Sequence, residues 1–157
     1  MTGYSQAVED YLEVLYVISM AQKVARVKDV AQAMGVTMPS VVAAVKSMTE
    51  KGLVTQEKYG YIELTPKGRA AAQDIYHRHQ VLLAFFQDVL ALDPATAEQD
   101  ACRVEHHLSP QARERLLQFV EFIRDCPQGR PEFLERFMAF VKTGGRELCT
   151  GCCRKEE

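Results

Sequence analysis

The pattern of apolar and polar residues predicts three consecutive helices in the first third of the chain. Helices are expected over residues 4–21, 27–34 and 39–51, where apolar side chains recur every three or four positions. Gly35 is a favoured helix-stop residue and Pro39 a favoured helix-opening residue, so a tight turn separates the last two. Two short helices joined in this way form a helix-turn-helix.

Two strands and four more helices are predicted after this motif. Residues 54–64 read as two short strands around Lys58-Tyr59-Gly60, which is typical of a β-hairpin or wing. Thr-Pro, Asp-Pro and Ser-Pro pairs and a final Pro131 then mark helix starts, which gives helices over about 66–90, 94–108, 110–126 and 131–143. Leu116, Phe119, Val120 and Ile123 are expected to be buried. The predicted fold is mainly α, an N-terminal winged helix-turn-helix with a small β-hairpin wing followed by an all-helical domain.

This pattern divides the chain into three parts. Residues 1–70 are predicted to form a winged-helix DNA-binding domain, 71–145 a helical domain, and 146–157 a flexible tail that contains cysteines. The apolar helices beyond residue 94 exceed what a lone winged helix needs for its core. We therefore expect a homodimer whose two-fold axis is mirrored in a palindromic double-stranded DNA operator.

Composition narrows the class of protein. The 157 residues are 47% hydrophobic and 25% charged, as in ordinary globular proteins. We find no apolar run of roughly 18 residues and no signal-peptide pattern, so we expect a cytoplasmic protein without a membrane partner. The net charge is −2, but residues 1–70 carry eight Lys and Arg against seven Asp and Glu, which permits DNA binding.

The third helix is the candidate DNA-reading helix, because small and polar residues occupy its outward positions. Small side chains let the backbone approach base edges, and Pro39 or Ala43 can contact a thymine methyl group. Basic residues nearby are placed to neutralise phosphates. The predicted DNA-contacting residues are Arg26, Lys28, Thr37, Pro39, Ser40, Ala43, Lys46, Ser47, Lys51 and Lys58.

Two clusters of metal-binding residue types flank this region. Residues at i, i+3 and i+4 share one helical face, so Cys102, Glu105 and His106 present a thiolate, a carboxylate and an imidazole together. Asp10 and Glu13 form a carboxylate pair on the first helix. With His79 on the helix between them in sequence, these six donors suit a divalent transition metal better than calcium or magnesium.

As a set, these motifs resemble the diphtheria-toxin-repressor family of iron- and manganese-dependent repressors, to about residue 143. The resemblance rests on Glu9-Asp-Tyr-Leu-Glu13, the segment from Val36 to Leu53, Leu64-Thr-Pro-Lys-Gly-Arg69, His79 and Val104-Glu-His-His-Leu-Ser109. It implies a winged helix followed by a helical metal-binding and dimerisation domain. It also implies a repressor of metal-ion homeostasis, not an enzyme, with no small organic substrate. The length matches the shorter members, which lack the additional SH3-like domain.

The resemblance implies a hybrid metal site. Asp10, Glu13 and His79 match ligand positions of the manganese branch, and Glu105 and His106 match ligands of both branches. Cys102 instead matches the iron branch, while Leu83 and Glu98 replace an acidic and a histidine position of that branch's ancillary site. Since thiolate is the more selective donor, we expect Fe2+ to be favoured, with Mn2+ next.

The sequence is also compatible with other functions. Two cysteines in the tail have the Cys-x-x-Cys spacing of zinc and iron–sulfur ligands. The tail could therefore be inert or form a second metal or redox site. The candidate residues for such a site are Cys126, Cys149, Cys152 and Cys153. A winged-helix regulator that responds to thiol redox state or to an organic ligand is the main rival. A metal-dependent hydrolase is less favoured, because no spare general acid or base accompanies the cluster.

Overall fold

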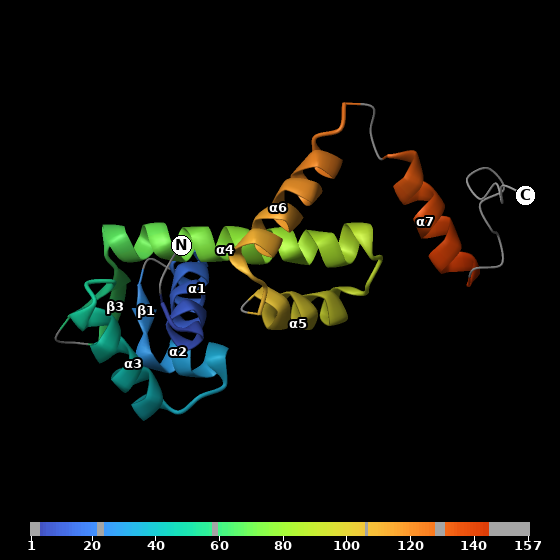
Figure 1. The fold of residues 1–157 in the computed structure, drawn as a ribbon. Coiled ribbons are helices and arrows are strands. Elements are labelled where there is room, and N and C mark those ends of the chain that lie inside the picture. The colour runs from blue at the N-terminus through green and yellow to red at the C-terminus, as the bar shows by residue number, and fades with distance from the viewer. Residues whose placement is uncertain (1–3, 22–23, 58–59, 106, 128–130, 145–157) are drawn as a thin grey trace, which may run out of the picture. The chain divides into compact units, whose positions relative to one another are not determined.

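The computed structural model describes residues 4–21, 24–57, 60–105, 107–127 and 131–144. The chain divides into two compact units, Met1–Arg78 and His79–Glu157, and the boundary falls inside one helix, α4 (Pro66–Ala84). Figure 1 shows the helices and strands of the first unit, including most of α4, and the later helices of the second unit. None of the described helices is both long and apolar enough to span a membrane.

The first unit contains the predicted helix-turn-helix. Its helices are α1 (Gln6–Ala21), α2 (Val27–Met34) and α3 (Met38–Glu50). Gly35 ends α2 with φ at 64°, in the left-handed region that glycine adopts without steric cost. Thr37 caps α3, since its hydroxyl oxygen accepts a hydrogen bond from the Ser40 backbone N–H at 3.4 Å. The helix-turn-helix prediction is confirmed.

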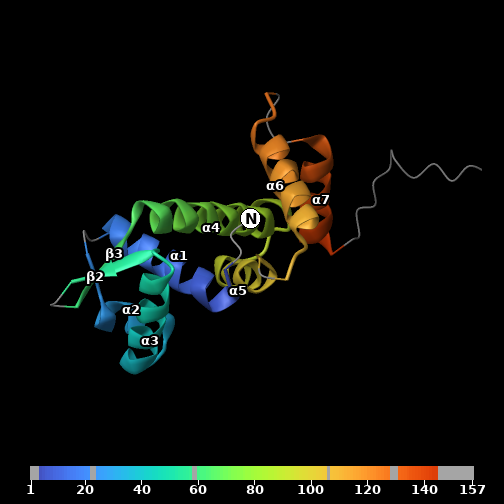
Figure 2. The same cartoon turned by 60° about the vertical axis from the view of Figure 1, so that its left-hand side comes forward.

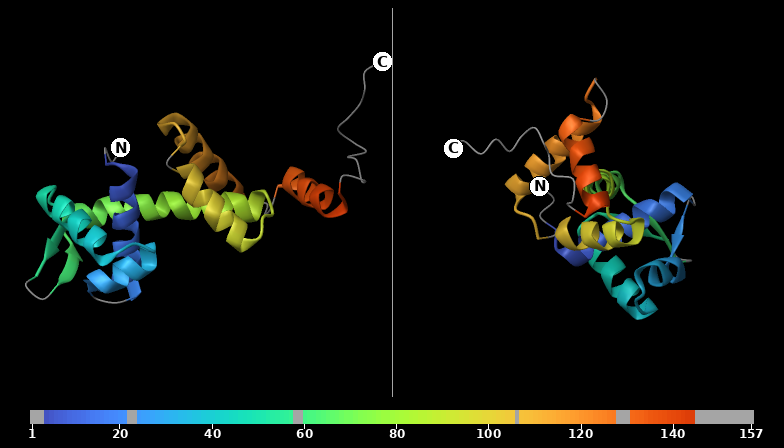
Figure 3. Two further views of the ribbon diagram at one scale, coloured as in Figure 1. Left: turned by 90° about the horizontal axis from the view of Figure 1, so that it is seen from below. Right: turned by 90° about the vertical axis from the view of Figure 1, so that its right-hand side faces the viewer.

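A small antiparallel sheet forms the wing. Its strands are β1 (Ala25–Arg26), β2 (Val54–Gln56) and β3 (Tyr61–Leu64), in the order β1-β3-β2. The left view of Figure 3 follows the chain from α3 into β2 and β3. Val54 pairs with Leu64, as the predicted hairpin requires, and Ala25 pairs with Ile62 on the other side of β3. Strand β1 was not predicted, because two residues carry no readable alternation.

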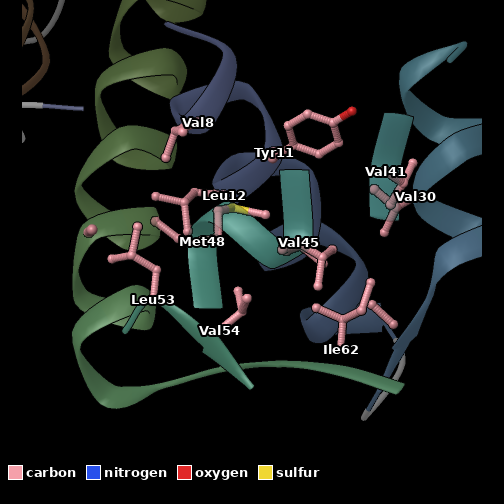
Figure 4. Close-up of a cluster of buried hydrophobic side chains, with 14 of the residues drawn as sticks. Val8, Tyr11, Leu12, Val30, Val41, Val45, Met48, Leu53, Val54 and Ile62 are labelled. Atoms are coloured by element: carbon pink, nitrogen blue, oxygen red, sulfur yellow. The ribbon is translucent and has the colours of Figure 1, made fainter. Parts of the chain in front are cut away.

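One hydrophobic core holds these helices and strands together (Figure 4). From α3, Val41, Val45 and Met48 are fully buried, as the periodicity predicts. Each such side chain contributes about 1.5–3 kcal/mol through burial. On α1 the buried residues are Val8, Tyr11, Leu12 and Leu15, whereas Ala7 is exposed.

Hydrogen bonds connect the start of α4 to residues 51–53, which follow α3. The Thr65 hydroxyl donates to the Gly52 carbonyl oxygen at 2.8 Å and accepts from the Gly68 backbone N–H at 3.0 Å. The Thr65 backbone N–H donates to the Leu53 carbonyl oxygen at 3.0 Å, and Lys67 Nζ donates to the Lys51 carbonyl oxygen at the same distance. These bonds satisfy polar groups at two helix ends that face each other.

The second unit is helical. After Ala84 the chain makes a π-helical turn, Phe85–Val89, and continues into α5 (Pro94–Glu105), α6 (Pro110–Arg124) and α7 (Glu132–Thr143). Asp93 precedes α5, and hydrogen bonds from the Thr96 side chain and backbone hold the pKa of its carboxyl below the usual value. The predicted helical fold of this half is confirmed.

A smaller core joins the helices of the second unit. Val89, Ile123 and Leu134 are buried together in one cluster. The last two residues come from α6 and α7, which can be followed in Figure 2. Val120 and Ile123 are buried as predicted, and Leu116 is partly buried. The prediction for Phe119 was wrong, because this side chain is 37% exposed.

Candidate metal centre and nucleic-acid interface

His79 lies between two carboxylates in the second unit. It is only 5% exposed, and its ring nitrogens face different partners. Nδ1 lies 3.3 Å from Oε2 of Glu105, and Nε2 lies 3.2 Å from Oε1 of Glu98. A neutral imidazole donates a proton from one nitrogen and offers a lone pair on the other. The ring can therefore bind a cation through one nitrogen while the other is hydrogen-bonded.

Glu105 is buried because of its position on α5. Ala97, Ala101 and Glu105 are four residues apart, and all three are buried, so the carboxylate continues an apolar stripe into the interior. The Glu105 side chain is 6% exposed. Burying a carboxylate is costly unless a positive or hydrogen-bonding partner compensates it. This pair of a buried carboxylate and an imidazole suits a divalent transition metal.

The other predicted ligands are distributed as follows. Asp10 and Glu13 are both partly buried on α1 of the first unit. They are three residues apart and so lie on the same face of this helix. Cys102 is exposed on α5. His106 lies outside the described residues. Among the described residues of the second unit, the predicted ligands that the structure brings into contact are His79 and Glu105.

The candidates for a second thiol site are mostly outside the described part of the chain. Cys126 is partly buried beside Phe122 and Pro127 at a surface pocket. The tail cysteines Cys149, Cys152 and Cys153 fall beyond residue 144.

The outward face of α3 is apolar at its start and basic further along. Met38 and Val42 are 56% and 49% exposed, and Pro39, Ala43 and Lys46 are also exposed. Met38, Val42 and Lys46 are four residues apart and so lie along one side of the helix. Sequence reasoning missed Met38 and Val42, because an apolar residue in a helix is normally assigned to the core.

Two predicted DNA-contacting residues have structural roles at the turn, since Thr37 caps α3 and its hydroxyl lies 2.9 Å from that of Ser40. Ser47 is only partly buried on α3.

The predicted phosphate contacts in the first unit are exposed where the structure describes them. Lys28 and Lys51 are exposed, while Lys58 lies outside the described residues. Arg26 is exposed on β1, where its guanidinium lies 5.4 Å from the centre of the Tyr61 ring and Nη2 donates to the Tyr61 hydroxyl at 3.3 Å. Stacking on an aromatic ring restricts the guanidinium without removing its charge.

Each half of the chain matches a model of a known protein family. Residues 4–62 match the family model described as the N-terminal DNA binding domain of iron dependent repressors. Residues 65–141 match the model described as their metal binding and dimerisation domain.

Individual relatives support the same assignment. An uncharacterised HTH-type transcriptional regulator of Methanocaldococcus jannaschii is 34% identical over 77% of this chain and 98% of its own length. The HTH-type transcriptional regulator MntR of Geobacillus kaustophilus is 32% identical over 76% of this chain and 84% of its own.

Solved structures share the fold. The manganese regulator SloR superposes with a TM-score of 0.64 at 30% identity, over 76% of this chain and 56% of that one. The chain thus spans little more than half of that longer protein. These relatives are transcriptional regulators, which are not enzymes. The chain belongs to the diphtheria-toxin-repressor family of metal-dependent transcriptional repressors.

Proposed function

We propose that this protein represses genes of metal-ion homeostasis by binding a palindromic operator as a homodimer when Fe2+ or Mn2+ is bound. The observation that carries the proposal is the buried pair of His79 and Glu105, whose Nδ1 and Oε2 atoms lie 3.3 Å apart. A divalent cation compensates the burial of that carboxylate and uses the imidazole as a second ligand.

The proposed ligands are those that the sequence predicts: Asp10, Glu13, His79, Cys102, Glu105 and His106. Glu13, His79 and Glu105 each offer a ligand atom of a type that divalent transition metals bind. Carboxylates at 10 and 13 favour Mn2+, whereas a thiolate at 102 favours Fe2+, Co2+ or Zn2+. We place Fe2+ first because thiolate is the more selective donor.

An ion with ligands from both units restricts their relative arrangement. Asp10 and Glu13 belong to α1 of the DNA-binding unit, and His79, Cys102 and Glu105 belong to the helical unit. The metal-bound arrangement is proposed to be the one in which both reading helices of a dimer fit the operator. Metal then raises DNA affinity because it binds that arrangement more tightly than the others.

The homodimer is supported by exposed aromatic side chains on the second unit. Phe122 on α6 and Phe133 and Phe140 on α7 are 69%, 53% and 46% exposed. Phe133 and Phe140 are seven residues apart and so lie along one side of α7. An exposed apolar face commonly marks an interface with another chain. The match of this segment to a dimerisation domain points in the same direction.

Operator binding measured by fluorescence anisotropy tests the proposal. We expect Fe2+ or Mn2+, added anaerobically, to raise operator affinity by about 5- to 150-fold, with Zn2+ and Co2+ compared in parallel. A titration at concentrations far above the dissociation constant should reach saturation at two chains per palindrome. Equal affinity with and without every metal, or saturation at one chain, would contradict the proposal.

Lys46 supplies a separate prediction about the DNA contact. It is exposed on α3, beyond the apolar side chains of the outward face. We expect Lys46→Ala to weaken binding to operator and to random DNA by a similar factor, and to reduce the slope of log affinity against log salt by about one. The measurement is a salt titration with both DNA sequences.

Val42→Ala is the matched control for Lys46→Ala, since it removes apolar surface from the same helix face. It should change preference between operator variants and leave the salt slope unaltered. If Lys46→Ala changed sequence preference alone, the proposed orientation of α3 on DNA would be wrong.

A further inference from the structure

Glu98 contacts the buried His79 ring from the side opposite Glu105. Its Oε1 atom lies 3.2 Å from Nε2 of His79, whereas Glu105 lies at Nδ1. The two carboxylates differ in environment, because the Glu98 side chain is 61% exposed and that of Glu105 is 6% exposed. The imidazole is thus held between a solvent-facing and an interior carboxylate.

Because the two carboxylates differ in exposure, the two ring nitrogens of His79 are expected to differ in their role. A histidine that binds a metal is neutral, with a lone pair on the ligating nitrogen and a proton on the other. The buried carboxylate is the one that needs a cation, so Nδ1, beside Glu105, is the ligating nitrogen. The proton then resides on Nε2, which donates a hydrogen bond to the Glu98 carboxylate.

We infer that Glu98 is a positioning residue for the metal site: it holds the proton on Nε2 of His79 and so leaves Nδ1 as the ligand. The inference rests on the proposed function, because His79 has to be a ligand. Carboxylate partners of this kind fix the tautomer and orientation of ligating histidines. A glutamate at this place is outside the predicted ligand set, and its only sequence signal was that it departs from the iron branch's histidine.

Metal affinity is the first test. Full-length wild-type protein, Glu98→Ala and Glu98→Gln are titrated anaerobically with Mn2+ alone, and free Mn2+ is measured by electron paramagnetic resonance. We expect Glu98→Ala to weaken binding by about tenfold, at the lower end of the 10- to 100-fold range for such partners because Glu98 is largely exposed. Glu98→Gln keeps an acceptor oxygen and should give an intermediate affinity.

Asp100→Ala is the matched control. It removes the same charge from α5, two residues away and therefore on another side of the helix. Its Mn2+ affinity should remain within about twofold of wild type if the effect of Glu98 is local rather than due to net charge. Equal losses in Asp100→Ala and Glu98→Ala would overturn the inference.

The tautomer of His79 is the second test, and it uses the metal-free protein. Imidazole nitrogen-15 spectra, with His79 assigned through a His79→Asn variant, report which nitrogen carries the proton. The population protonated only at Nε2 should fall in Glu98→Ala relative to wild type and Asp100→Ala. An unchanged tautomer overturns the positioning role, even if wild type binds no Mn2+ and the proposed function fails. A Glu98→Ala loss as complete as that of Glu105→Ala would make Glu98 a ligand and also overturn it.

Discussion

Replacing Glu105 by glutamine is expected to remove the metal response of operator binding while the protein remains folded. Glutamine keeps the size of the buried side chain and its capacity to hydrogen-bond with His79, but it has no charge to attract a cation. The gain in operator affinity on adding Fe2+ or Mn2+, about 5- to 150-fold in wild type, should fall close to one. Anisotropy titrations with and without metal measure this gain.

Glu121→Gln is the control for Glu105→Gln, since it neutralises an exposed glutamate on α6. It should keep the full metal response. Glu105→Ala should lose the response as well, and circular dichroism establishes that each variant is folded. A Glu105→Gln protein that metal activates as strongly as wild type would exclude this carboxylate from the metal site.

The second large effect is expected from Gly68→Ala, which should destabilise the protein although it places a better helix former in α4. A Cβ atom at this position would lie 1.8 Å from the Leu53 carbonyl oxygen and 2.8 Å from its carbonyl carbon. Both are backbone atoms, so α4 has to move away from the chain that follows α3. Overpacking of this kind costs about 1–3 kcal/mol or more. Thermal unfolding should show a melting temperature lower by about 2–4 °C per kcal/mol.

Gln73→Ala provides the comparison for Gly68→Ala, because Gln73 is exposed on the same helix. It should leave the melting temperature unchanged or slightly raised, as helix propensity predicts. A Gly68→Ala variant more stable than wild type would mean that α4 does not approach Leu53 so closely.

The elements that sequence reasoning predicted well are those with local signals at their ends. Gly35, Thr37 and Pro39 mark the turn between α2 and α3 through their own backbone preferences, so the helix-turn-helix was predictable. The π-helical turn Phe85–Val89 was not, because its residues continue an ordinary helical pattern. Phe119 was assigned to the core because periodicity identifies an apolar face but not what covers it.

The candidate metal site was predictable only in part, because local sequence patterns do not report burial or contacts between helices. Helical spacing groups Cys102 and Glu105, but it does not say which of the two is buried; the structure has Glu105 buried and Cys102 exposed. The contact of Glu98 with His79 joins residues 19 positions apart on different helices. No local pattern reports such a contact, and the same holds for Arg26 and Tyr61, which meet because β1 pairs with β3.

The hydrogen bonds between the start of α4 and the end of α3 affect how the protein opens locally. The segment that follows α3 cannot move away from α4 without breaking the bonds from Lys67 and Thr65 to the carbonyls of Lys51, Gly52 and Leu53. The same rupture removes the cap of α4, the helix that continues to His79. We therefore expect these two helix ends to unfold together, so that opening at the end of the DNA-reading helix is coupled to opening at the start of the histidine-bearing helix.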